Sequence, residues 1–211
     1  MTSKLASSER ERLQAKNTEL ATLAGHGVTV TNCPWIYSMR GGYLRSISRY
    51  RQAGINVCLG TDTQPDDILR EMRWGAIMGK VAGGTAATAT AREVYNAVTV
   101  NGARFLGRDD VGRLAPGGKA DIAVVDLDRP ALSAQDDPIR SLVYYASMAD
   151  VKQVFIGGRL LVDDFHCPLV DEAAVSRRAQ QVAGKVRQTL VGWDRDSATM
   201  EAFYPPSFEM R

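Results

Sequence analysis

The side chains that most often bind metal ions or act as nucleophiles, histidine and cysteine, are scarce in this sequence and far apart. Its two histidines are His26 and His166. Its three cysteines are Cys33, Cys58 and Cys167, an odd number without CxxC spacing, so the sequence predicts neither a disulfide framework nor a zinc knuckle. We expect buried free thiols, a surface or capping role for His26, and no metal site at the adjacent His166 and Cys167.

Two polar residues at the ends of predicted strands are candidates for chemistry. Asp62 follows the apolar run 55–60, and Asn32 lies near the end of the β-branched run 28–33. The carboxyl ends of parallel strands are where α/β barrels build their active sites. On local sequence alone, however, the favoured role of Asp62 is to cap the helix that follows it.

The elements that position these two residues follow from the spacing of apolar residues. Helices are predicted over 4–24 and 43–53, and the strand 28–33 between them ends in a loop over 35–42. A second strand, 55–60, completes a strand–helix–strand unit. Apolar strands of this kind are typical of a parallel sheet that is covered by helices.

Two further helices are predicted from the residues at their ends. Pro65 suits a helix start, and that helix should reach about Val81. Thr90 and Glu93 have the spacing of a capping box, in which each side chain accepts a hydrogen bond from the backbone N–H of the other residue. The helix that this box begins is expected to run to about Leu106.

The pattern then changes to short strands and tight turns. The strands are predicted over 111–114, 121–126, 151–156 and 159–163. Pro116-Gly117-Gly118 indicates a type II turn between the first two, and Gly157-Gly158 is a strong two-residue hairpin signal between the last two. The sequence therefore predicts a small β module, then a terminal helix over 171–190 and an extended tail over 204–207.

Several of these motifs in combination resemble the amidohydrolase superfamily. Residues 54–63, GINVCLGTDT, followed by residues 68–73, ILREMR, resemble the eighth barrel strand of that family and the helix after it. Residues 101–107 and then 112–126 are similar to the family's link from its barrel to its β-sandwich. Residues 27–34 resemble its seventh strand. The resemblance is strongest to the branch of chlorohydrolases and of cytosine, guanine and triazine deaminases.

The resemblance implies an α/β fold that is only part of the family's architecture. We expect the C-terminal part of a (β/α)8 amidohydrolase barrel, about the last two βα units, with a small β-sandwich module and a C-terminal helix. The corresponding segments are a partial barrel at 1–107, the sandwich module at 108–166, and the helix and tail at 167–211. A complete barrel needs eight strands and about 250 residues, so most of it is expected to lie outside this chain.

The resemblance also implies roles for the two strand-end residues. Asp62 matches the family's aspartate that binds the metal and exchanges a proton with the attacking water, so we expect it to be a catalytic residue and a metal ligand. Asn32 stands where many relatives carry a histidine, and it either contacts the substrate or is a plain strand-end asparagine. The complete family site holds Zn²⁺ or Fe²⁺ through several histidines, including an HxH pair. This sequence has no HxH, so we expect that the chain alone does not retain the metal.

The function implied by the resemblance is that of a metal-dependent hydrolase. It would act on carbon–nitrogen bonds other than peptide bonds, or on C–Cl bonds, of cyclic amidine, triazine or nucleobase-like small molecules. The alternative is a non-catalytic truncated fragment, or one half of a split enzyme that requires a complementary N-terminal half as its partner chain. A homo-oligomer is also open.

Composition excludes two other classes of partner. The 26 Lys and Arg residues are scattered among 24 Asp and Glu, which does not indicate nucleic-acid binding. No apolar run approaches the ~20 residues that a membrane span needs. The polar start of the sequence lacks the pattern of a signal peptide, so a cytoplasmic location is expected.

Overall fold

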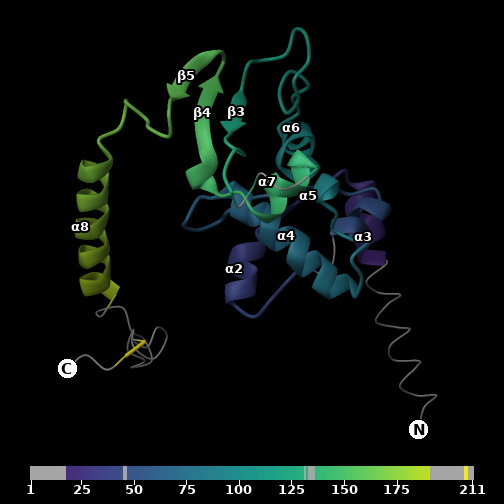
Figure 1. Ribbon diagram of the computed structural model, residues 1–211. Helices are drawn as coiled ribbons and strands as arrows, with labels where there is room; N and C mark the ends of the chain where they lie inside the picture. Colours follow the sequence, from purple (N-terminus) through teal and green to yellow (C-terminus); the bar gives the residue numbers. More distant parts are fainter. Residues whose placement is uncertain (1–17, 45–46, 131, 133–135, 191–206, 209–211) are drawn as a thin grey trace. The chain divides into compact units, whose positions relative to one another are not determined.

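The computed structural model describes residues 18–44, 47–130, 132, 136–190 and 207–208 (Figure 1). Its contacts divide the chain into two units, Met1–His166 and Cys167–Arg211. The elements of the first unit are, in order, β1 (Thr29–Asn32), α2 (Pro34–Met39), α3 (Ile47–Gln52), β2 (Asn56–Leu59), α4 (Ile68–Gly83), α5 (Ala91–Val98), α6 (Val100–Phe105), β3 (Ile122–Val125), α7 (Pro138–Tyr144), the 3₁₀ turn η1 (Met148–Asp150), β4 (Val151–Ile156) and β5 (Arg159–Val162).

Strands β1 and β2 form a parallel pair. Thr29 lies opposite Asn56, and Asn32 lies opposite Leu59. The helices α2 and α3 lie between the two strands in the sequence, which confirms the predicted strand–helix–strand unit. Because both strands run in the same direction, the residues that follow them lie at the same end of the sheet, where the carboxyl ends of the strands meet.

The core of this unit lies between that sheet and the helices α4, α5 and α7. Val57 of β2, Met72 and Ala76 of α4, Val94 of α5 and Val143 of α7 are each at most 2% exposed. Burying a side chain such as valine or methionine contributes about 1.5–3 kcal/mol. This packing fixes the helices on the sheet and so holds the strand ends in place.

Helix α4 begins three residues later than the sequence predicts, at Ile68 and not at Pro65. Its N-cap is Asp67, which is buried. The Asp67 carboxylate accepts hydrogen bonds from the backbone N–H groups of Leu69 and Arg70, at 3.0 and 3.2 Å. These bonds satisfy two of the donors that a helix start leaves open, so the cap sets where the helix begins.

The predicted capping box at the start of α5 is confirmed. The backbone N–H of Thr90 donates to Glu93 Oε2 at 2.9 Å, and the N–H of Glu93 donates to Thr90 Oγ1 at 3.3 Å. The single helix predicted to reach Leu106 is wrong, because the chain breaks at Thr99, where φ is −114° and ψ is −97°. The Thr99 hydroxyl donates to the carbonyl of Tyr95 at 2.8 Å, a side-chain bond that competes with regular helix geometry.

The loop predicted over 35–42 is wrong in its first half, because residues Pro34–Met39 form helix α2. Pro34 is the first helical residue. Its fixed φ suits the helix, and its missing N–H is one that a helix start would leave without a partner. A proline directly after the β-branched run therefore begins a helix here and not a loop.

The strand predicted over 111–114 is also wrong, because this segment is a tight loop against α6. Gly112 has a φ of +84°. A Cβ on Gly112 would lie 2.8 Å from the Cβ of Ala103 and 2.9 Å from the carbonyl oxygen of Thr99. Only glycine permits both this backbone angle and this approach.

The remaining strands, β3, β4 and β5, form an antiparallel sheet (Figure 1). Gly157 and Gly158 both have positive φ, of 57° and 79°, so the predicted hairpin between β4 and β5 is confirmed. The predicted type II turn is also confirmed: Gly117 has a φ of +82°, and the N–H of Gly118 donates to the carbonyl of Ala115 at 3.0 Å.

The second unit contains α8 (Glu172–Leu190), which confirms the predicted terminal helix. Most of the tail predicted over 204–207 lies outside the described residues. Residues 4–17 of the N-terminal helix predicted over 4–24 also lie outside the described residues. Residues 18–25 are described, and they are helical. Among the helices that the structure describes, none is long and apolar enough to cross a membrane.

Candidate functional site

Asp62 lies in a strained turn three residues after Leu59, the last residue of β2. Its φ is +60°, and the backbone N–H of Thr63 donates to the carbonyl of Thr61 at 2.6 Å. A bond from residue i+2 to residue i across a centre of positive φ makes the rare and strained form of the γ-turn. Strained residues of this kind cluster at functional sites.

The Asp62 side chain is exposed and does not cap the helix that follows. Asp67 performs that role for α4, which removes the local alternative for Asp62 that the sequence favoured. The turn instead presents the carboxylate to solvent at the edge of the sheet that both strands reach. There it can accept a proton from water and return it.

The thiol of Cys33, directly after β1, lies within electrostatic reach of two carboxylates, those of Asp62 and of Glu71 on α4. Burial raises the pKa of the Cys33 thiol, and the carboxylates of Asp62 and Glu71 raise it further. Glu71 is fully buried, and burial raises its own pKa, although a hydrogen bond from the backbone N–H of Trp35 opposes the shift. That bond, to Glu71 Oε2, measures 3.0 Å. The sequence did not indicate that Glu71 is buried and binds the backbone of Trp35, because its helical spacing is the same as that of a solvated acid.

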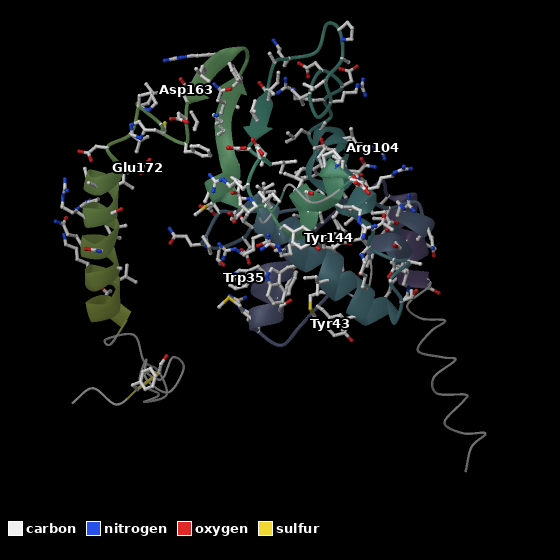
Figure 2. All side chains as sticks on the ribbon, viewed as in Figure 1. Trp35, Tyr43, Arg104, Tyr144, Asp163 and Glu172 are labelled. Atoms are coloured by element: carbon white, nitrogen blue, oxygen red, sulfur yellow. The ribbon has the colours of Figure 1, made fainter. Side chains whose placement is uncertain are left out.

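Glu71 and the aromatic residues around it hold α2 against α4. Trp35 lies on α2 (Figure 2). Its ring meets that of Trp74 edge-on, with centroids 5.3 Å apart, and the Arg70 guanidinium lies 5.0 Å from the centroid of the Trp35 ring. The contacts of Trp35 are those of a packed residue.

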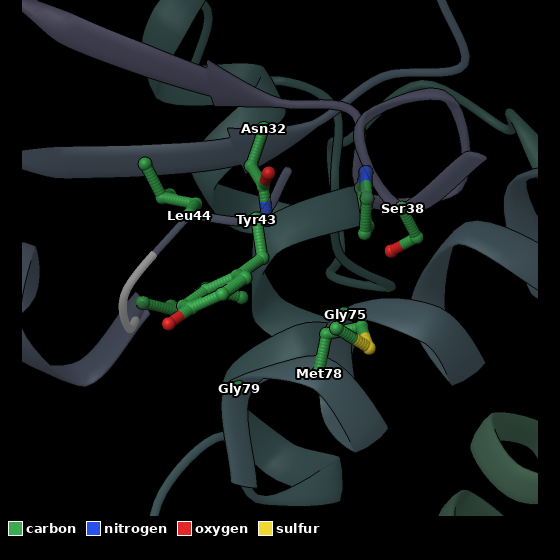
Figure 3. A pocket seen from close by; sticks show the side chains of 9 residues that line it. Asn32, Ser38, Tyr43, Leu44, Gly75, Met78 and Gly79 are labelled. Carbon is green, nitrogen blue, oxygen red and sulfur yellow. The ribbon is translucent and has the colours of Figure 1, made fainter. Parts of the chain in front are cut away.

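Asn32 is buried whereas Asp62 is exposed, although both residues lie at the carboxyl end of the sheet. Its side chain is only 5% exposed and points from β1 toward α4, into a small cavity (Figure 3). Its backbone carbonyl accepts from the N–H of Gly60 at 3.0 Å, which ties the two strand ends together. The structure thus brings the two candidate residues to one edge but turns one side chain inward and exposes the other.

A large apolar hollow lies beside β2, between the sheet and the segments that follow α4. Its volume is about 650 Å³. Thr31 and Cys58, whose side chains are 3.2 Å apart, contribute from the sheet. Large apolar residues on its wall are strongly exposed: Phe105 by 57%, Leu106 by 65% and Leu114 by 77%. A contiguous apolar surface of this kind marks a place that binds a ligand or another polypeptide.

The remaining candidate ligands are dispersed. The three cysteines are free, and only Cys58 is fully buried. His26 is exposed at the end of the first described helix, where Nδ1 lies 2.8 Å from the carbonyl of Thr22. His166 is exposed, and its backbone forms an isolated antiparallel β-bridge with the backbone of Asp163. Across the described ranges, no three His, Cys, Asp or Glu side chains lie close enough to hold a metal ion.

Comparison with known proteins gives a consistent result along most of the chain. The sequence profile of the Amidohydrolase family matches residues 8–161. A 5-methylthioadenosine/S-adenosylhomocysteine deaminase of Natronomonas pharaonis is 35% identical over 173 residues, which are 80% of this chain and 40% of the relative. A 5'-deoxyadenosine deaminase of Methanothermobacter thermautotrophicus is 33% identical over 175 residues, or 81% of this chain and 41% of the relative.

Solved structures agree with the sequence relatives. An adenosine deaminase of Xanthomonas campestris with bound zinc aligns with a TM-score of 0.73 at 27% identity, over 81% of this chain and 40% of that chain. The zinc complex of an atrazine chlorohydrolase of Arthrobacter aurescens aligns with a TM-score of 0.67 at 26% identity, over 78% and 38%. The chain therefore has the α/β fold of these proteins over the part it matches, and it spans about 40% of the length of the relatives.

Proposed function

This chain belongs to the amidohydrolase family, and we propose that it supplies the last two βα units of a (β/α)8 barrel whose site hydrolyses a carbon–nitrogen bond of a cyclic, adenine-like small molecule. The relatives that support this substrate class are a 5-methylthioadenosine/S-adenosylhomocysteine deaminase and a 5'-deoxyadenosine deaminase. In this proposal β1 and β2 are the last two barrel strands. Residues 1–107 are then the barrel segment, 108–166 the sandwich module and 167–211 the C-terminal helix and tail.

The observation that carries the proposal is the turn at Asp62. An exposed carboxylate is held by a strained γ-turn at the carboxyl end of a parallel strand, and it is not used as a helix cap. Asp62 would take a proton from the attacking water and pass it to the leaving nitrogen. Proton transfer of this kind by a positioned side chain contributes about 10²–10⁴-fold to a rate.

The residues of this chain do not fit a metal ion by themselves. Zinc and iron sites in proteins need three or four ligands, and the described part of the chain gathers no such group around Asp62. We infer that Asp62 is one ligand of a site whose other ligands lie on the part of the family fold that this chain does not match. The side chain of Asn32 is turned toward α4 (Figure 3). Asn32 would therefore act indirectly, by holding the end of β1 in place next to the substrate.

The apolar hollow supports a partner that completes the fold. Its wall exposes large apolar side chains to solvent, most strongly those of Phe105, Leu106 and Leu114. A small ligand would cover few of them, whereas barrel strands from another polypeptide segment would bury all of them and would pair with the free edge of the sheet. A chain that binds such a segment without catalysis is the second candidate function.

The test is complementation. The part of the Natronomonas pharaonis relative that this chain does not match is expressed as a separate polypeptide and mixed with the full chain, and ammonia release from 5-methylthioadenosine is measured with zinc present. We expect a complex with activity, and an Asp62→Asn variant that forms the same complex but is slower by about 10²–10⁴-fold. Asp66→Asn, in the same turn segment, is the matched control and should leave the rate unchanged.

The outcomes separate the two candidates. A complex without ammonia release would favour the non-catalytic binding chain. Full activity of Asp62→Asn would refute the catalytic role of that residue. Elemental analysis of the chain alone gives a further check: stoichiometric zinc that is lost in Asp62→Ala would show that this chain closes the metal site without a partner.

A further inference from the structure

Two buried polar atoms in the small cavity beside β1 have no protein partner among the described residues. They are Oδ1 of Asn32 and Oγ of Ser38. Both residues line the same cavity, Asn32 from the last position of β1 and Ser38 from the last turn of α2 (Figure 3). A buried polar atom without a hydrogen bond is costly, so native structures rarely leave two of them facing one space.

The size and the walls of the cavity restrict what can occupy it. Its volume is about 10 Å³, which is about the minimum that admits one water molecule and is too small for an organic ligand. The rest of the wall is mostly apolar: Pro34, Leu44, Ile47, Gly75, Met78 and Gly79, with Tyr43. Among the described residues of this wall, none carries a charge that could offset the desolvation of a charged occupant, and an empty space would leave both polar atoms without a hydrogen bond.

We propose that this cavity binds a single water molecule that bridges Asn32 and Ser38. The carbonyl oxygen of the Asn32 side chain only accepts, so the water donates to it. The Ser38 hydroxyl can donate to the water oxygen or accept its second proton. The bridge links the last residue of β1 to α2 across the residues 33–37, where Glu71 already holds the backbone of Trp35.

The bridge gives Asn32 a positioning role that is independent of any substrate. It fixes the segment directly after β1, and this segment lies at the same sheet edge as Asp62. Losing either polar side chain should therefore loosen α2, and losing both should cost little more than losing one, because a water bridge needs both ends.

A crystal structure of the full chain tests the proposal directly. We expect one ordered water within about 2.6–3.2 Å of both Asn32 Oδ1 and Ser38 Oγ, and we expect it to be absent in Ser38→Ala. An empty cavity, a protein side chain in it, or a direct bond between the two residues would each overturn the proposal.

Melting temperatures provide an independent measurement. The decreases caused by Asn32→Ala and Ser38→Ala should fail to add in the double variant, by at least about 2 °C, as for residues in one hydrogen-bond network. Asn32→Ala combined with Ser141→Ala is the control, because Ser141 on α7 donates to the carbonyl of Leu132 and does not line the cavity. Its decreases should add. Equal additivity in both pairs would contradict a shared water.

Discussion

Replacing Glu93 by alanine should lower the free energy of unfolding by about 3 kcal/mol, mostly through hydrogen bonds that Glu93 makes while buried. The side chain is 8% exposed. It accepts from the backbone N–H of Thr90 at 2.9 Å and from the hydroxyl of Ser48 at 3.1 Å, and it pairs with Arg51 at 2.9 Å.

The magnitude follows from these contacts taken one at a time. Loss of the capping box costs about 1 kcal/mol. The buried Ser48 hydroxyl also loses its acceptor, which costs about 1–3 kcal/mol for a buried group left without a partner. The Arg51 pair adds little, because the Arg51 side chain is 65% exposed and solvent screens the interaction.

Denaturant unfolding followed by circular dichroism measures the effect, with Glu93→Gln as the matched control. Glutamine keeps acceptor and shape and also occurs in capping boxes, so it should lose about 1 kcal/mol, chiefly from the weaker uncharged hydrogen bonds. The melting temperature of Glu93→Ala should fall by about 6–12 °C. If alanine and glutamine cost the same, or if alanine costs under about 1 kcal/mol, then the buried network is not what stabilises this helix start.

Two other perturbations test separate parts of the fold. Gly112→Ala should destabilise the chain by about 1–3 kcal/mol in calorimetry, because the added Cβ meets Ala103 and Thr99 at a φ of +84°; Gly107→Ala, at a φ of +65° in open space, should cost about 1 kcal/mol, and equal losses would refute the steric argument. Burial raises the pKa of Glu71, so the folded state favours its protonated form, and the free energy of unfolding should fall as pH rises from the ordinary glutamate pKa of 4.5 through the raised pKa. Glu71→Gln should remove that slope in denaturant titrations at a series of pH values, and a slope that persists in the variant would assign it to other groups.

Features encoded in a few neighbouring residues could be predicted from the sequence. The capping box of Thr90 and Glu93 and the Gly157-Gly158 hairpin are local, since the residue types alone set the backbone and its hydrogen bonds. The parallel pairing of β1 and β2 was also predictable, because two short apolar strands with a helical connection have few other arrangements.

Features set by distant contacts could not be predicted. The loop at Gly112 depends on its approach to α6, and a glycine within an apolar run gives no sign of that approach. Local sequence alone favoured Asp62 as a helix cap, although the family resemblance implied a catalytic and metal-binding role. Asp67 fills the cap position and leaves Asp62 in a γ-turn. The inward direction of Asn32 depends on the packing of α2 and α4, which no local pattern specifies.

The positive φ of Asp62 means that selection for stability and selection for activity should favour different residues at position 62. Glycine would adopt this angle without the steric clash that a side chain brings. A library sorted only for heat resistance should therefore enrich glycine at position 62, whereas a library sorted for hydrolysis in a complemented enzyme should retain aspartate. Enrichment of glycine in one pool and of aspartate in the other would indicate a trade-off between stability and activity. Deep sequencing of the two sorted pools measures it.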